Sequence, residues 1–532
     1  MARFLDWWRR EERCARLMKA LLLALLPVAC CVAYCAAQGH WIGDVYLPNS
    51  EWNDELFYYK QVEGILSHGY PQGYFGFNES HALKLSFAAW SPVLVFPWVV
   101  WGLLFGWNLM SPVVCNIVVM SLCCFLYVWL VRPSWKQLGV TALLFGLYNN
   151  FARYMLSGMP EVLCFAMVIL FYALAVNYLR RKKDYEIIVL FLMACVMTLM
   201  RPYLALFLLL PSWFLIRRGG SPLGKWLGAL GSLLILGATF CIYACVKHYL
   251  GAEYLTPLFF TDWLEAFPEQ GFLGGLRFTV EKLWAKGVEY IAYAKQGIRA
   301  VNTTGAVYAG YLICLIVLAS QSVEEWASRR RGGKEPGGCT AVRNHLTFCF
   351  LVMLPALFLM YKTIEGGRHL LTFMAAAVFL IPLTAARFHI RAACLGIAFA
   401  YLYIYRAVEP YDYQVAYVQE ERRACLEEWG EVFSEELALD EKDTPNYENV
   451  VIWAQSDSVE DAPVYTAWQL LYALPEGFGI SCCTREYVTE NMETLQSRYL
   501  FAPLGGEIEQ GCEEAGYERL YSDGGMALFE LR

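Results

Sequence analysis

The residues that could do chemistry begin with an adjacent acidic pair, Asp54-Glu55, which opens an amphipathic segment after the first apolar run. A carboxylate held at the edge of a membrane can take the proton of a hydroxyl group and activate it as a nucleophile. The alternative is that both acids only stabilise the first turn of a helix capped by Ser50 or Asn53. The pair is therefore a candidate general base with a structural alternative.

Helical spacing places Asp54 on an apolar stripe. Tyr58, Val62, Ile65 and Leu66 form an apolar stripe over 54–68, and Asp54 lies on it, four residues before Tyr58. A carboxylate on a buried face is costly unless it has a partner or a task. Asp54 is therefore a candidate catalytic residue, with Tyr58 on the same face of the helix.

A second acid, Glu161, follows Pro160 at the start of an apolar run, and Arg153 precedes the same short loop. An acid and an arginine that face each other at a membrane surface indicate a polar cavity. The competing interpretation is a proline in the first helical position followed by an acid that favours the helix dipole.

Two further arginines, Arg201 and Arg368, lie at ends of apolar runs on the predicted outer side, where positive charge is disfavoured. A guanidinium matches the geometry of a phosphate, so a lipid phosphate is the expected partner. The alternative is snorkelling, or a structural ion pair with Glu365 or Glu161. His369 is interpreted as an interface residue rather than a metal ligand, because no second His or Cys is placed beside it.

The composition requires a membrane. The 532 residues are 58% hydrophobic and 17% charged, with a mean hydropathy of +0.38, which is too apolar for a soluble protein of this length. A span needs about 20 apolar residues. We predict about eleven transmembrane helices, at 20–37, 110–131, 138–156, 161–179, 186–200, 203–216, 226–246, 305–320, 346–361, 369–386 and 392–406.

Whether the apolar run at 91–107 spans the membrane determines the predicted orientation of all the spans that follow it. It contains two prolines and several tryptophans, and we expect it to lie along the interface rather than to span. With that choice the basic runs at 180–183 and 329–331 fall inside, as the positive-inside rule requires. The N-terminus is then cytoplasmic, and the loops 38–109 and 247–304 and the tail 407–532 are outside. A transmembrane domain over 1–406 thus carries one soluble domain.

The tail 407–532 carries 27 Asp/Glu and 7 Lys/Arg, so nucleic acid is not an expected partner. Residues 449–453 and 525–531 resemble buried strands, whereas 467–474 and 488–500 have helical periodicity. We predict a small α/β domain. No glycine-rich phosphate loop occurs in the chain, and the cysteines lack metal-ligand spacing.

The order of these motifs resembles the GT-C glycosyltransferases, in particular the branch of protein O-mannosyltransferases and lipid A aminoarabinose transferases. The resemblance covers about residues 20–406. It consists of the acidic pair with Tyr58-Tyr59, the interfacial helix at 91–107, the Ser-Gly-Met-Pro-Glu161 entry to a span, Met200-Arg201-Pro202, and Gly366-Gly367-Arg368-His369. The family usually has an Asp where this chain has Gly158 or Met159.

The resemblance implies a function and a site. Asp54 would deprotonate or orient the acceptor, with Glu55 and Glu161 as supporting acids. Arg153, Arg201 and Arg368 would hold the phosphate of a polyprenyl-phosphate-linked sugar donor, with Tyr58 and His369 beside it. The acceptor would be a glycan, lipid or protein of the cell envelope, reached on the outer face of a bacterial plasma membrane among membrane lipids. No cofactor is expected; a divalent metal is compatible with this reaction class but not indicated by the residues.

Two other classes of function stay open from the sequence. A transporter or flippase for lipid-linked sugars would show broken helices and inverted repeats, and no clear repeat is present. A non-enzymatic receptor or assembly protein would tolerate substitution of the membrane acids and depend on the tail.

Overall fold

The computed structural model describes residues 2–45, 54–69, 75–79, 91–148, 150–250, 259–299, 303–330, 339–363, 366–384, 396, 420–440, 447–454, 467–523 and 525–532. Ser50, Asn53 and Glu365, and nearly all of the predicted span at 392–406, lie outside these residues.

Most of the described chain before residue 385 is helical. The elements are α1 (Ala2–Ala24), α2 (Leu26–Ala37), η1 (Ile42–Asp44), α3 (Asp54–His68), η2 (Pro92–Val95), α4 (Phe96–Phe105), α5 (Ser111–Val131), α6 (Trp135–Leu147), α7 (Asn150–Met155), α8 (Glu161–Arg181), α9 (Asp184–Met200), η3 (Pro202–Leu208), α10 (Leu209–Arg218), α11 (Pro222–Leu250), α12 (Asp262–Arg299), α13 (Thr303–Arg330), α14 (Thr340–Met360) and α15 (Gly367–Thr384).

Seven helical segments in the described part of the chain are long and apolar enough to cross a membrane, so the protein is a multi-pass membrane protein. They are 12–37, 111–131, 161–181, 222–249, 305–327, 340–360 and 367–384, and each coincides with a predicted span. The predicted spans at 138–156, 186–200 and 203–216 are helical but shorter or interrupted, as α6 with α7, α9, and η3 with α10.

The ambiguous run at 91–107 forms η2 and the ten-residue helix α4. Ten residues rise about 15 Å, half of the roughly 30 Å hydrocarbon core. The prediction that this segment does not span therefore agrees with its length. Ser91 caps η2 by accepting the N–H of Val93, and Gly106 ends α4 with a φ of 83°.

The tail contains α17 (Glu420–Glu436), η5 (Tyr447–Asn449), β2 (Val450–Ala454), α18 (Ala467–Leu470), η6 (Leu471–Ala473), β3 (Gly479–Cys483), α19 (Arg485–Glu490), η7 (Met492–Thr494), β4 (Tyr499–Pro503), α20 (Glu507–Ala515), β5 (Glu518–Asp523) and β6 (Met526–Glu530). The predicted strands at 449–453 and 525–531 and the helix at 467–474 are present. The helix predicted over 488–500 is wrong in its second half, because Tyr499 and Leu500 begin β4 as fully buried strand residues.

The sheet has the order β1-β3-β2-β4-β6-β5, and its edge strand β1 (Phe75–Phe77) comes from the loop after the first span. The strands β1, β3, β2 and β4 are parallel, and β6 and β5 complete the sheet in antiparallel fashion. Alternate residues of β2 serve opposite faces. Val451 and Trp453 join the core that includes α17 and η6, whereas Ile452 and Ala454 pack with α19 and α20. The α/β prediction is thus confirmed, with one strand from outside the tail.

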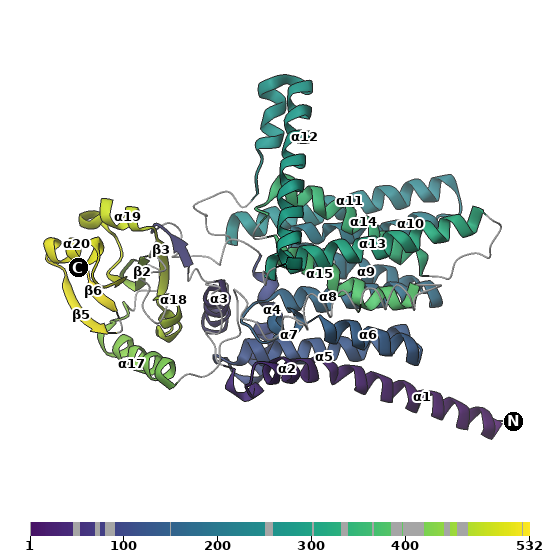
Figure 1. Cartoon of the computed structure of the whole chain (residues 1–532), viewed down its shortest axis with the longest axis horizontal. Coiled ribbons are helices and arrows are strands. Elements are labelled where there is room, and N and C mark those ends of the chain that lie inside the picture. The colour runs from purple at the N-terminus through teal and green to yellow at the C-terminus, as the bar shows by residue number, and fades with distance from the viewer. Residues whose placement is uncertain are drawn as a thin grey trace.

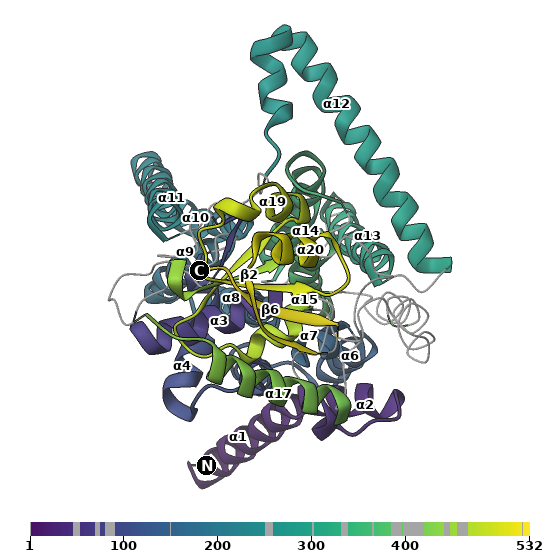
Figure 2. The same cartoon turned by 90° about the vertical axis from the view of Figure 1, so that its left-hand side faces the viewer.

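Figure 1 shows the helical bundle on one side and the sheet on the other, with α3 between them. The view along the bundle in Figure 2 places the sheet over the ends of α8 and α15. The first loop and the tail therefore lie at the same end of the bundle, away from the N-terminus of the chain. This shared end is where the candidate residues meet.

Candidate active site

Nearly every side chain of α3 is buried, because the helix lies between the helical bundle and the sheet. Glu55 is fully buried, and its Oε1 accepts the backbone N–H of Gly158 at 3.0 Å. A Cβ on Gly158 would lie 3.2 Å from the Cβ of Glu55, so glycine permits this close approach. Glu55 therefore fastens α3 to the loop before α8.

The accessible acid is Asp54. Its Oδ2 is 2.5 Å from Nη1 of Arg368, and about a fifth of each side chain is exposed, 24% and 20% respectively. Tyr361 at the end of α14 lies on the other side of the guanidinium, with its hydroxyl 3.5 Å from Nη2. This partly exposed ion pair joins α3 to the start of α15, some three hundred residues later in the chain.

A second ion pair lies deeper. Nη2 of Arg201 donates to Oε1 of Glu161 at 2.6 Å, and both side chains are fully buried. Nη1 of Arg201 lies 3.1 Å from Nδ1 of His369. A guanidinium only donates hydrogen bonds, so Nδ1 accepts and the neutral ring carries its proton on Nε2. The rings of Tyr203 and Tyr361 pack edge-on against this imidazole.

Tyr58 connects the two pairs. It is 1% exposed, and burial raises the pKa of its hydroxyl well above the usual value, while the nearby Arg201 opposes that rise. Asp54 and Glu161 also lie close enough to raise it. Tyr58 is therefore neutral at physiological pH and is not a candidate base. Arg153 on α7 is buried at the same end of the bundle.

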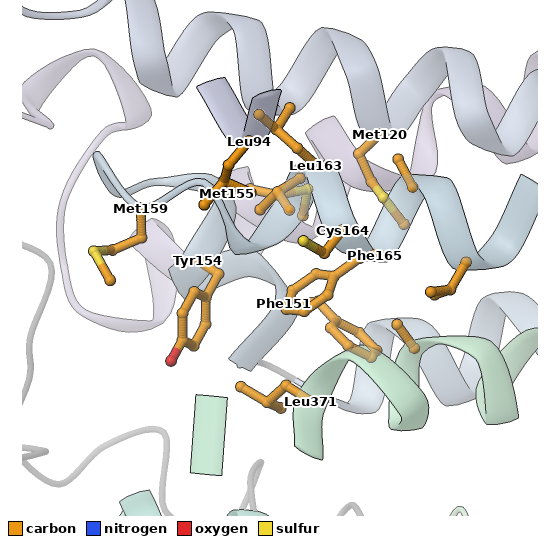
Figure 3. Close-up of a cluster of buried hydrophobic side chains, with 14 of the residues drawn as sticks. Leu94, Met120, Phe151, Tyr154, Met155, Met159, Leu163, Cys164, Phe165 and Leu371 are labelled. Atoms are coloured by element: carbon orange, nitrogen blue, oxygen red, sulfur yellow. The ribbon is translucent and has the colours of Figure 1, made fainter. Parts of the chain in front are cut away.

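An apolar cluster supports the loop that carries Gly158 and Glu161. Figure 3 shows side chains from η2, α5, α7, α8 and α15 meeting beneath it: Leu94, Met120, Phe151, Tyr154, Met155, Met159, Leu163, Cys164, Phe165 and Leu371. Pro160 is the N-cap of α8, and Glu161 is its first residue. The sequence predicts the proline in the first helical position, so the helix begins one residue later than predicted. Close packing below the loop holds its polar groups in fixed positions.

The tail packs against α3, the helix that carries Asp54 and Glu55. The buried ammonium of Lys60 donates to the carbonyl of Leu474 at 2.7 Å and to Glu63 at 2.8 Å. The rings of Tyr59 and Tyr472 lie 5.2 Å apart. Burial, and then the charge of Glu55, raises the pKa of Tyr472 well above its usual value. The end of η6 thus reaches the helix that carries both acids.

All eight residues predicted for the site gather at this end of the bundle. Asp54, Glu55 and Tyr58 come from α3, Arg153 from α7, Glu161 from α8, Arg201 from the end of α9, and Arg368 and His369 from α15. The partner of Arg201 is Glu161, which is the structural alternative left open by the sequence. Gly158, Tyr361, Lys60 and Tyr472 were not predicted, since their roles arise from contacts between distant segments.

The described residues contain no group of three or more His, Cys, Asp or Glu side chains arranged to hold a metal ion. His369 is held by Arg201 and two tyrosine rings. The tail cysteines Cys425, Cys483 and Cys512 are free thiols.

No protein-family model matches this chain, and no curated protein matches it. Among solved structures it is similar to ArnT from Cupriavidus metallidurans in the apo state, at 11% identity and a TM-score of 0.41. It is also similar to the same protein bound to undecaprenyl phosphate, at 13% identity and a TM-score of 0.40. Each match covers 96% of this chain and 97% of the other.

Proposed function

We propose that this protein is an inverting glycosyltransferase that moves a sugar from a polyprenyl-phosphate carrier to a glycan, lipid or protein of the cell envelope. In this proposal the reaction takes place at the end of the bundle that the sheet covers, on the outer face of a bacterial plasma membrane; the positive-inside pattern supports the outer side. One observation carries the proposal: the partly exposed carboxylate of Asp54 lies against the partly exposed side chain of Arg368. The fully buried pair of Arg201 and Glu161 lies deeper in the bundle.

The chemistry requires one base and one cation. The carboxylate of Asp54 takes the proton of the acceptor hydroxyl, whose oxygen attacks the anomeric carbon of the sugar. The bond from that carbon to the carrier phosphate breaks, and its electron pair stays on the phosphate oxygen. A single displacement inverts the anomeric configuration. Arg368 stabilises the charge on the departing phosphate through charge-assisted hydrogen bonds.

The resting ion pair has a consequence for the order of events. In this structure Oδ2 of Asp54 accepts a hydrogen bond from Arg368, so that oxygen is not available to take the proton of an acceptor hydroxyl. A carrier phosphate that binds Arg368 replaces that carboxylate and frees Asp54 for the acceptor. Donor binding would thus activate the base.

The buried residues have supporting roles in this proposal. Arg201 is fully buried and paired with Glu161, so we assign it to positioning rather than to the phosphate. It fixes His369, the neighbour of Arg368 on α15. Glu55 holds α3 on the loop before α8. The difference in exposure supports Asp54 over Glu55 as the base.

The test is transfer by the purified protein from radiolabelled polyprenyl-phosphate sugars to an envelope extract. We expect Asp54→Asn to lower the rate by about 10²–10⁴-fold, the usual contribution of a general base. A matched control, Glu63→Gln, changes an acid on the same helix that pairs with Lys60. Transfer that survives Asp54→Asn unchanged would remove the catalytic assignment. Donor binding and movement across the bilayer without any transfer would instead indicate a transporter.

A further inference from the structure

The element α12 is a helical hairpin that the proposed function does not use. A short arm begins at Asp262, Gly271 reverses the chain with a φ of 74°, and a long arm runs on to Arg299. In Figures 1 and 2 the hairpin projects sideways from the bundle, crosswise to the spans, at the end nearest the sheet.

The foot of this hairpin is fixed. Tyr290 is buried, donates a hydrogen bond to the carbonyl of Tyr308 on α13 at 3.0 Å, and packs against Phe358 of α14. At the start of the short arm, the N–H of Phe260 donates to the carbonyl of Met360 at 3.0 Å. The arms are therefore held at the ends of two spans while the rest extends outward.

The long arm carries an exposed apolar stripe. At successive steps of three or four residues, which places them on one helical face, it presents Leu273, Leu276, Val280, Trp284, Val288 and Ile291, all exposed. Trp284 is 77% exposed. Arg277 lies on the same helical face, between the directions of Trp284 and Val288, and pairs with Glu281 at 2.7 Å. A soluble surface rarely exposes such a continuous patch.

The stripe faces away from the short arm. Gly275 of the long arm lies directly against Phe267 of the short arm, with a position for a Cβ 2.6 Å from that ring. At 100° per residue, the stripe lies on the opposite side of the long arm from Gly275. In Figure 1 the short arm is on the side of the sheet and the long arm on the side of the bundle.

We propose that the long arm of α12 lies on the bilayer, with its stripe inserted at the boundary between headgroups and acyl chains. The hairpin connects two spans, α11 and α13, and runs crosswise to them from their ends, which is the direction of a helix that lies along a membrane surface. A tryptophan and a long basic side chain on the apolar face are typical of helices that lie in the interface, where the basic group reaches the headgroups. The occupant of the stripe is lipid, and the hairpin fixes the depth at which the spans and the site lie.

The experiment uses the full-length protein in bilayer discs of phosphatidylethanolamine and phosphatidylglycerol. Trp284→p-benzoylphenylalanine places a photoreactive group on the stripe, and Ala285→p-benzoylphenylalanine places it on an exposed position about 100° away. After irradiation, intact mass identifies lipid adducts and cross-linked dimers, and peptide mapping after proteolysis identifies cross-links within the chain. We expect lipid adducts at position 284 at several times the yield at 285.

Adducts of position 284 to the sheet domain or to a second copy of the chain would overturn the proposal. Equal yields of lipid adduct at both positions would also overturn it. Val280→p-benzoylphenylalanine repeats the measurement one turn earlier, so that a folding defect of one variant does not decide the result. Sugar transfer is not needed for this measurement, so its outcome is independent of the proposed function.

Discussion

At the scale of single residues, the solvent exposure of the side chain distinguishes charged residues that look alike in the sequence. Arg201 and Arg368 both end apolar runs, but only Arg368 reaches solvent, whereas Arg201 is sealed with Glu161. A buried ion pair contributes little net stability, yet breaking it leaves one charge uncompensated. The two arginines should therefore respond differently to substitution.

For Arg368 we expect an effect on the reaction rather than on folding. Arg368→Lys keeps the charge but loses the planar fork that matches a phosphate, so it should raise KM for the donor more than it lowers kcat. Arg368→Gln should lower kcat/KM by about 10²–10³-fold, as for the loss of a group that stabilises developing charge. Initial rates at varied donor concentration measure both. An unchanged KM in the lysine variant would contradict the assignment to the phosphate.

For Arg201 we expect a loss of stability. Arg201→Met leaves Glu161 buried without its cation and should destabilise the protein by about 3–5 kcal/mol. The double variant Arg201→Met with Glu161→Leu removes both charges and should recover most of that loss. Thermal unfolding in detergent compares the two. If the single variant is as stable as the wild type, the deep pair is not a structural one.

At the scale of elements, periodicity predicts what each helix is but not what covers it. The stripe of α3 is buried as expected from Tyr58 and Val62, but the charged residues Glu55 and Lys60 are buried as well. Their partners, Gly158 and Leu474, lie about a hundred and four hundred residues away. No local pattern contains such contacts. The helix predicted over 488–500 fails for a related reason, since β4 is specified by pairing with β2 and β6.

The junction between α3 and the loop before α8 can be tested at Gly158. Gly158→Ala places a methyl group 3.2 Å from the Cβ of Glu55, and overpacking of this kind costs roughly 1–3 kcal/mol. We expect lower stability and slower transfer, since α3 carries Asp54. The control is Gly139→Ala, because a Cβ at that position meets no atom within 4 Å. Equal effects of the two substitutions would show that the junction is not tight.

At the scale of the whole molecule, the first loop and the tail form one folded unit. The chain supplies β1 from residues 75–77, and Glu79, buried directly after it, accepts hydrogen bonds from the N–H groups of Gln496 and Ser497 and from the hydroxyl of Ser497. The sequence predicts both segments on the outer side, but their union follows only from the structure. Deletion of 407–532 would therefore disturb α3 in a transferase and in a receptor alike, and does not distinguish them.

Glu79 provides a test of this union. Glu79→Gln keeps the shape but turns an acceptor into a group with two donors, which would face backbone N–H donors in a buried place. We expect a loss of about 1–3 kcal/mol, the usual cost of an unsatisfied buried polar group. Limited proteolysis of the tail measures it, with the exposed Glu486→Gln as the control. Proteolysis rates that are equal for the two variants would contradict the role of Glu79.

The pairing of β1 with the tail also determines when this part of the fold can form during synthesis. Glu79 reaches its hydrogen-bond partner Ser481 across 402 residues of chain. At about 5–20 residues per second, a ribosome needs on the order of 20–80 s to make that stretch. Throughout this time the remaining spans enter the membrane, and the part of the tail that contacts α3 has not yet been made. If the proposed function holds, the nascent chain is therefore expected to be inactive until the tail has been made, because residues 75–77 have no β3 to pair with before then.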